Sequence, residues 1–343
     1  MLPERYVWED ETSVVEATSD GTGLNLIRYM IEVKKHVWTR HVPVFREIMK
    51  NEKFDLVIGD ETYALSIAIK ERKMSIDIPF FMIYDFVGVD TTGGGLYEKL
   101  AAYITNRNWV KPVPDLLQYC FVGEAEDVPD KPFGLLLPNR REWTRQRCHI
   151  LGYVVPFDPE AYRDRAKIKA RLGYDERPLI VVSIGGTSVG RNLLDLSARA
   201  FTILKQKNPS VQMVLVCGPR LDTSSLDVPE GVKVKGFVED LYEHFAACDL
   251  AVVQGGNTTT IELTALRRPF ICFPIEGHFE QMQIAERLQR HRAGVPMTLS
   301  ATTPEALAKK MEENLGKTVD YAPIPTDGAR MMAQLVTETL GSN

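Results

Sequence analysis

A glycine turn in the second half of the chain has the composition of an anion-binding site. Its residues are Gly255-Gly256-Asn257-Thr258, and they follow a short apolar run at 250–253 that predicts a buried strand. We expect Asn257 or Thr258 to cap the helix that follows, because a side-chain oxygen there accepts hydrogen bonds from otherwise unpaired amides. The amides and the positive end of the helix dipole then meet at one point, where a phosphate group can bind.

A carboxylate, Glu262, comes one helical turn after Thr258, so both side chains lie on one face of the predicted helix. Ile261 and Leu263 flank Glu262 and predict that it is partly enclosed. A carboxylate one turn beyond a phosphate-binding turn suits the ribose diol of a nucleotide, because it can accept hydrogen bonds from both hydroxyls. The alternative is an ordinary glycine turn followed by an ordinary buried glutamate.

Two further polar side chains, Glu280 and Gln281, open the next predicted helix after a loop that contains His278. A carboxylate and an amide side by side are suited to hydrogen-bond the hydroxyls of a sugar. His278 fits either a residue that lines the site or an exposed loop residue. An apolar run at 269–273 lies between this pair and the glycine turn, so the whole segment predicts a strand–helix–strand unit.

A second glycine turn, Gly185-Gly186-Thr187, follows the strongest apolar run of the chain, at 178–184. Because glycine has no Cβ atom, the amides of such a turn can approach a phosphate closely. Arg191 stands at the exit of the turn, where it could add positive charge. The turn is a weak signal alone and becomes informative when it is paired with the turn at 255–258.

The order of these features resembles the donor-site signature of GT-B glycosyltransferases. The matching residues are Gly-Gly-Asn-Thr at 255–258, then Glu262, Pro274 and the pair Glu280-Gln281. The pattern is similar to the nucleotide-sugar motif of UDP-glycosyltransferases and to the donor half of the bacterial peptidoglycan GlcNAc transferase. The resemblance covers residues 175–343 well and the first half of the chain loosely.

The resemblance implies an α/β fold of two Rossmann-like domains, each built on a parallel sheet, with a cleft between them. It implies that the turn at 255–258 holds the pyrophosphate of the donor, that Glu262 holds the ribose, and that Glu280 and Gln281 hold the sugar. The turn at Gly185 would then face the donor phosphates.

The resemblance also assigns a place to the nucleotide base and to the end of the chain. The base would lie against Phe237 or Val238, through main-chain contacts or stacking, and the alternative is that Phe237 is a buried core aromatic. The final helix, expected over residues 328–340, would pack back across the first domain.

Length and composition fit two globular domains. The 343 residues allow each domain its own core. We expect an acceptor-side domain over residues 1–155 and a donor-binding domain over residues 160–343, with a linker near 153–159 where two prolines bracket a turn. The first domain is expected to be reduced, without the usual opening strand.

Composition also excludes several classes of protein. Hydrophobic residues make up 44% of the chain and charged residues 25%, as in a soluble globular protein, and we expect a cytoplasmic location. The net charge of −5 argues against nucleic-acid binding. The five cysteines show no metal-binding spacing and predict reduced core residues. No apolar run is long enough to span a membrane, and peripheral membrane contact stays open.

Candidate catalytic residues lie at the ends of two predicted strands of the first half. Asp60 and Glu61 follow an apolar run at 54–59, and Asp85 follows a run at 78–84. Ligands of open parallel sheets bind beyond the carboxyl ends of the strands, so Asp60 and Asp85 are our candidates for the base that deprotonates an acceptor. Each of these carboxylates also fits a helix cap or a turn.

GT-B enzymes usually open with a strand and a glycine-rich turn, often with a histidine nearby, whereas residues 1–25 of this chain are polar and irregular. Two interpretations follow: the true protein is longer, or the first domain is a reduced variant. Either leaves a sheet edge that some other element should cover.

The sequence therefore predicts a hexosyl transfer from a nucleotide diphosphate sugar, UDP-linked, to a hydroxyl of an unidentified acceptor. By family analogy the reaction inverts the anomeric carbon and needs no cofactor and no metal. One alternative is a non-catalytic donor-binding half, or a remnant, that requires a partner subunit. The other is a sugar-nucleotide epimerase of the GT-B fold.

Overall fold

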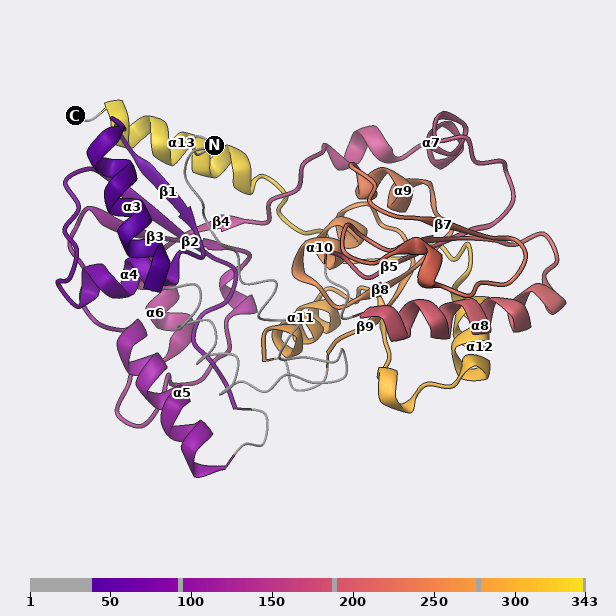
Figure 1. The fold of residues 1–343 in the computed structure, drawn as a ribbon, viewed down its shortest axis with the longest axis horizontal. Helices are drawn as coiled ribbons and strands as arrows, with labels where there is room; N and C mark the ends of the chain where they lie inside the picture. The colour runs from indigo at the N-terminus through magenta and orange to yellow at the C-terminus, as the bar shows by residue number, and fades with distance from the viewer. Residues whose placement is uncertain (1–38, 92–94, 187–189, 276–278, 342–343) are drawn as a thin grey trace. The chain divides into compact units, whose positions relative to one another are not determined.

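The structure of the chain, a computed structural model, describes residues 39–91, 95–186, 190–275 and 279–341 (Figure 1). These residues form two compact units. Unit 1 comprises residues 39–154 and 325–341, and unit 2 comprises residues 155–324. Each unit is built on one parallel β-sheet with helices packed against it, which is the predicted α/β architecture.

Unit 1 contains the smaller sheet, with the strand order β1-β2-β3-β4. All of its strand pairs are parallel. The strands are β1 (Val57–Asp60), β2 (Phe80–Tyr84), β3 (Leu117–Val122) and β4 (Cys148–Gly152). The helices are α3 (Thr39–Asn51), α4 (Tyr63–Lys70), α5 (Leu96–Trp109), α6 (Arg140–Arg147) and α13 (Gly328–Gly341). Among the described residues β1 pairs only with β2, so the predicted open edge of the first domain lies at β1.

The side chains of β2 alternate between two cores, because successive residues of a strand point to opposite faces of the sheet. Phe80 and Met82 pack in the core beneath α3 and α4. Phe81 packs on the other face against Met332 of α13. The final helix thus returns to the first sheet, as the resemblance implied, and burial on both faces explains why β2 is apolar throughout.

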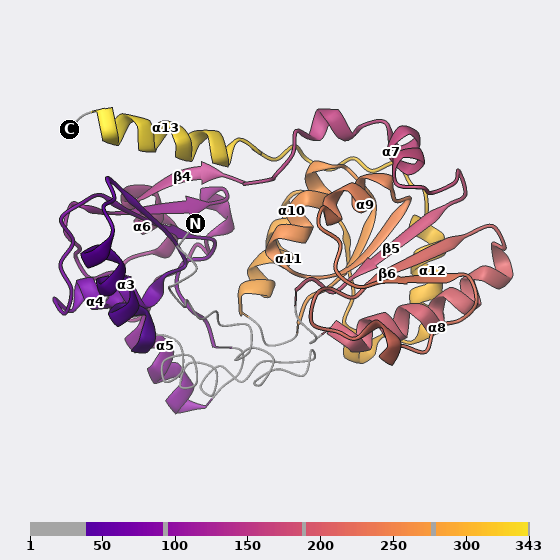
Figure 2. The ribbon, with the colours of Figure 1, turned by 45° about the horizontal axis from the view of Figure 1, so that its top comes forward.

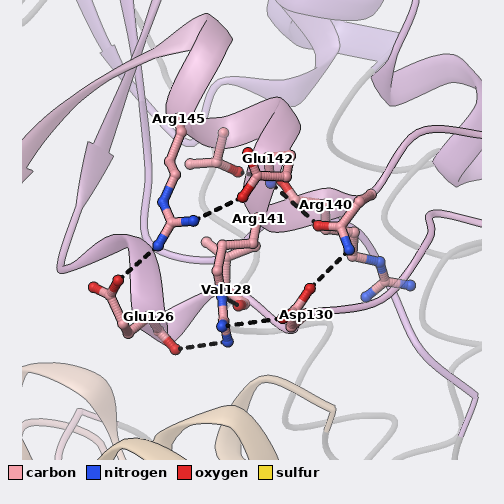
Figure 3. A network of polar contacts seen from close by, with 9 residues as sticks. Glu126, Val128, Asp130, Arg140, Arg141, Glu142 and Arg145 are labelled. Carbon is pink, nitrogen blue, oxygen red and sulfur yellow. Dashed lines mark hydrogen bonds and ion pairs between the residues drawn. The ribbon is translucent and has the colours of Figure 1, made fainter.

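Helix α6 has one large apolar residue, the buried Trp143, so no hydrophobic pattern in the sequence predicted this helix. Several of its other side chains make polar contacts (Figure 3). The guanidinium of Arg145 lies 2.7 Å from Glu142 and 2.8 Å from Glu126. Arg141 donates a 2.9 Å hydrogen bond to the carbonyl of Val128. These contacts join the helix to the segment that follows β3.

Unit 2 contains the larger sheet, with the strand order β10-β9-β8-β5-β6-β7 and every pair parallel. The strands are β5 (Leu179–Ser183), β6 (Gln212–Val216), β7 (Val232–Lys235), β8 (Leu250–Gln254), β9 (Phe270–Phe273) and β10 (Val295–Pro296). The helices are α7 (Arg165–Arg171), α8 (Arg191–Lys207), α9 (Leu241–Ala247), α10 (Asn257–Ala265), α11 (Phe279–Arg290) and α12 (Pro304–Asn314).

Helices cover both faces of the second sheet, so unit 2 has three layers (Figure 2). Ile180 and Val182 of β5 point into the core that α8 and α12 close. Leu179 and Val181 point into the core that α7, α9, α10 and α11 close. The five cysteines are unpaired, and all except Cys148 are buried. None of the described helices combines the length and the apolar character needed to cross a bilayer.

Candidate functional site

The two glycine turns emerge from neighbouring strands of unit 2. The turn at Gly185-Gly186 follows β5, and the turn at Gly255-Gly256 follows β8. β5 and β8 are paired in parallel, with Ser183 beside Val253 in the last register position. The two turns are far apart in sequence, and the fold brings them to the same edge of the sheet.

This edge is where the strand order of the sheet reverses. From β5 the chain continues through β6 and β7 on one side, and then β8 and β9 are added on the other side of β5. In open parallel α/β sheets, ligands bind outside the carboxyl ends of the strands at such a switch point. The topology therefore places both predicted turns where this class of fold binds its ligands.

Both turns contain glycines with open space beside them. A Cβ atom built on Gly185, Gly186 or Gly256 would meet no heavy atom of the described chain within 4 Å. Gly185 has a φ of +77°, which favours glycine. A ligand can therefore approach Gly185, Gly186 and Gly256 from the side of the missing Cβ atom without displacing a described side chain.

Helix α10 begins differently from the prediction. Its N-cap residue is Gly256, with a φ of −68° and a ψ of 147°, and no side chain caps the helix. The expectation that Asn257 or Thr258 is the cap was wrong, because the extended backbone that a cap requires occurs at the glycine and both residues are already helical. First-turn amides have no acceptor within the helix, so those of α10 are suited to an external anion.

Glu262 lies on the same helix and is buried, with 7% of its surface exposed. Burial raises the pKa of its carboxyl group to about 7, because the charged form is poorly solvated there. The enclosure predicted from its apolar neighbours is thus present. The carboxylate lies one helical turn after Thr258, which is exposed.

The predicted flanking residues of the donor site differ in their exposure. The guanidinium of Arg191 is held by Ser225, through hydrogen bonds of 2.7 Å to its carbonyl and 3.2 Å to its hydroxyl. Phe237 is 67% exposed, which excludes the alternative that it is a core aromatic. Val238 packs against the core of unit 2. Of this pair, Phe237 is therefore the side chain that a ligand can reach.

Four predicted donor-site residues are not placed fully by the structure. Thr187 and His278 lie outside the described residues. Glu280 and Gln281 belong to the first turn of α11, and their side chains are outside the described part. Their roles stay predictions from the resemblance.

A buried arginine that the sequence analysis did not single out contacts the turn at 255–258. Arg287 of α11 lies 2.5 Å from Oδ1 of Asn257 and 2.8 Å from Oγ1 of Thr260. The available signal was its spacing, because it follows Ile284 by three residues and precedes Leu288 on the apolar face of α11. Several of its neighbours in the sequence are charged, so the burial of Arg287 was not predicted.

In unit 1, the carboxylates predicted at the strand ends lie at one edge of the sheet. Asp60 is the last residue of β1, and Asp85 directly follows β2, which is paired with β1 in parallel. Burial and the charge of Asp85 raise the pKa of Asp60 above its ordinary value. The helix cap predicted as the alternative role is not formed by either residue, because the N-cap positions of α4 and α5 are Thr62 and Gly95.

Glu61 has a different environment. Its φ of +49° places it in a left-handed turn, and its carboxylate accepts a 2.6 Å hydrogen bond from the hydroxyl of Tyr63. The turn role that was the alternative for Glu61 is therefore the one observed. Within the described residues, no group of three or more His, Cys, Asp or Glu side chains is arranged to hold a metal ion.

The chain is similar to known glycosyltransferases. Residues 180–329 match the glycosyltransferase family 28 C-terminal domain. An uncharacterized glycosyltransferase of Methanosarcina acetivorans is 25% identical in an alignment of 280 positions that covers 79% of this chain and 67% of that protein. The UDP-N-acetylglucosamine--N-acetylmuramyl-(pentapeptide) pyrophosphoryl-undecaprenol N-acetylglucosamine transferase of a Thermoanaerobacter species is 28% identical over 316 residues, covering 79% of this chain and 85% of that protein.

Two solved structures share the fold. The glycotransferase of kitacinnamycin superposes with a TM-score of 0.57 at 17% identity, covering 92% of this chain and 83% of that chain. The calicheamicin glycosyltransferase CalG4 superposes with a TM-score of 0.53 at 16% identity, covering 91% and 83%. These likenesses establish the architecture of the chain.

Proposed function

We propose that this chain is a GT-B glycosyltransferase that transfers a hexosyl group from a UDP-linked sugar to an acceptor hydroxyl, with inversion and without an obligatory metal. The observation that carries the proposal is the pairing of two accessible glycine turns at the switch point of the second sheet, with a buried carboxylate one helical turn beyond. The choice of UDP follows the Thermoanaerobacter relative, which is named as a UDP-N-acetylglucosamine-dependent transferase.

The donor diphosphate is assigned to the first-turn amides of α10, with the turn at Gly185-Gly186 facing it. The amides of Gly255 and Gly256 already donate to the carbonyls of Phe273 and Gln254 and shape the turn. The dipoles of the first-turn amides are fixed before the reaction, so they stabilise the negative charge that develops on the departing diphosphate. Glu262 in its ionised form accepts hydrogen bonds from the ribose hydroxyls, and the exposed ring of Phe237 stacks on the base. Glu280 and Gln281 are assigned to the sugar hydroxyls.

The acceptor is activated by a carboxylate of unit 1, for which Asp60 and Asp85 are the candidates. The base removes the proton of the acceptor hydroxyl as the oxygen forms a bond to the anomeric carbon. The bond from that carbon to the diphosphate oxygen breaks, and its electron pair leaves with UDP. Because the acceptor approaches opposite the leaving group, the configuration at the anomeric carbon inverts.

A ligand screen tests the donor assignment before the acceptor is known. We expect UDP and UDP-hexoses to raise the melting temperature, since a ligand at 100 times its dissociation constant stabilises the native state by about 2.7 kcal/mol. GDP and TDP sugars are screened for comparison, to test the preference for UDP. Glu262→Gln is expected to weaken UDP binding. The absence of stabilisation by any nucleotide sugar would overturn the proposal.

A second measurement separates transfer from the alternative chemistries. Release of UDP from a UDP-hexose that depends on added acceptors, and that continues in the presence of a chelator, supports metal-independent transfer. Conversion of the UDP-hexose to an isomer without any acceptor would instead identify an epimerase.

A further inference from the structure

Helices α10 and α11 lie side by side in unit 2 (Figures 1 and 2), and Arg287 joins them. Its side chain is buried, with 7% of its surface exposed. One terminal nitrogen, Nη1, lies 2.5 Å from Oδ1 of Asn257, and the other, Nη2, lies 2.8 Å from Oγ1 of Thr260. A single side chain of α11 therefore holds two residues from the first turn of α10.

These two bonds fix the orientation of the groups that they contact. A guanidinium only donates, so the amide of Asn257 must present its oxygen to Arg287 and direct its Nδ2 donor away. The hydroxyl of Thr260, which is fully buried, accepts from Arg287 and must therefore aim its own proton elsewhere.

The proton of Thr260 is directed to the backbone of the glycine turn. Its Oγ1 lies 2.9 Å from the carbonyl oxygen of Gly256 and 2.9 Å from that of Asn257. A chain of donors thus runs from Arg287 through Thr260 to the main chain of the N-cap residue. The conformation of the turn is coupled to a rigid fork anchored in the neighbouring helix.

We propose that Arg287 is a positioning residue that holds the Gly255-Gly256-Asn257 turn in the conformation that binds the donor diphosphate. This inference rests on the proposed function and deepens it, because it names the group that organises the phosphate-binding turn. Arg287 acts through Asn257 and Thr260. Its guanidinium also adds positive charge to the positive end of the α10 dipole, which favours a bound anion.

The test compares two ligands that share a base and a ribose and differ in the diphosphate. Dissociation constants of UDP and uridine are measured by calorimetry for the wild-type chain and for Arg287→Met, Arg287→Lys and Thr260→Val, together with melting temperatures. The matched control is Arg290→Met, the same change three residues later on α11, at an exposed arginine whose guanidinium contacts His291.

We expect Arg287→Met to weaken UDP binding by about 10- to 100-fold, the range that corresponds to the loss of a hydrogen bond to a charged group. Uridine affinity should be unchanged, because the ribose and base contacts do not depend on the turn. Arg287→Lys should resemble Arg287→Met, since an ammonium cannot hold two acceptors in a fixed fork. Thr260→Val should lower UDP affinity in the same direction, and Arg290→Met should not.

Three results would overturn the inference, and only the last of them also overturns the proposed function. If wild-type chain binds UDP and the Arg287 variants retain its preference for UDP over uridine, the positioning role is wrong and the proposed function stands. The same conclusion follows if both ligands weaken equally, because that result indicates a general structural role. If the wild-type chain binds neither UDP nor another nucleoside diphosphate, the proposed function and this inference both fail.

Discussion

The carbonyl oxygen of Gly185 lies 2.3 Å from the position that a Cβ atom on Gly218 would occupy. Gly218 follows β6 and has a φ of +76°, so it is restricted by its backbone as well as by this contact. The turn after β6 thus supports the turn after β5, which we assign to the donor phosphates. The two turns can approach this closely only because residue 218 is a glycine.

Replacement of Gly218 by alanine is expected to destabilise unit 2 and to weaken UDP binding. The left-handed backbone alone costs an alanine about 1–2 kcal/mol, and the methyl group must also displace the carbonyl of Gly185. Gly173→Ala is the control, because Gly173 has a φ of +73° and a Cβ atom added to it would meet no described atom within 4 Å. Urea unfolding and calorimetry measure both effects, and equal losses in the two variants would contradict the role of the close contact.

The buried carboxyl group of Glu262 makes stability depend on pH. Its folded-state pKa of about 7 lies above the ordinary value of 4.5, so the folded state binds more protons than the unfolded state between these values. The free energy of unfolding should therefore fall as pH rises from about 4.5 to 7, by about 3 kcal/mol from this group. Glu262→Gln should lack this pH-dependent part of the free energy of unfolding. If urea unfolding shows the same pH dependence for both proteins, the raised pKa of Glu262 is refuted.

The exposed ring of Phe237 is expected to contribute to nucleotide binding and hardly to folding. Stacking of a base on an aromatic ring contributes about 1–3 kcal/mol, so Phe237→Ala should weaken UDP binding accordingly. The melting temperature should change little, because the ring is 67% exposed. Tyr97→Ala in α5, where the side chain is 83% exposed, is the matched control and should leave UDP affinity unchanged. An unaltered affinity in Phe237→Ala would remove this residue from the donor site.

The two strand-end aspartates of unit 1 can be distinguished by their pH profiles. If Asp60 is the base, Asp60→Asn should lower kcat by about 10²- to 10⁴-fold, the usual contribution of general-base catalysis. Asp85→Asn should move the acidic limb of the rate profile to lower pH, because it removes the like charge that raises the pKa of Asp60. Full transfer activity in both variants would show that the base lies elsewhere.

A buried ion pair in unit 2 is expected to be important for folding. Nζ of Lys169 lies 2.5 Å from Oδ2 of Asp249, and the same oxygen accepts a 2.8 Å hydrogen bond from the amide of Leu179. Asp249→Ala leaves a buried ammonium without its carboxylate, which typically costs about 3–5 kcal/mol. Glu312→Ala, which removes an exposed pair with Lys207, should have little effect on urea unfolding. A similar small loss in Asp249→Ala would contradict the prediction.

Local sequence patterns were sufficient to predict the strands and turns of the candidate site in unit 2. The apolar runs before Gly185 and Gly255 predicted buried strands, and the glycines predicted turns, because burial and backbone freedom are properties of short segments. The spacing of Glu262 between apolar neighbours predicted its enclosure. The N-cap of α10 was predicted at Asn257 or Thr258 and is Gly256. The residue types that favour capping do not show which residue has the extended backbone of the N-cap.

The order of the strands and the contacts between distant helices were decided by the tertiary structure. Each strand of a parallel sheet is compatible with several neighbours, so no local pattern shows that β5 lies beside β8 and that both turns meet at the switch point. Arg287 contacts Thr260 only because α11 packs along α10, and α13 covers the first sheet only because the chain returns after unit 2. The sequence alone determined which residues are candidates for a donor site, and long-range packing determined which of them lie close together.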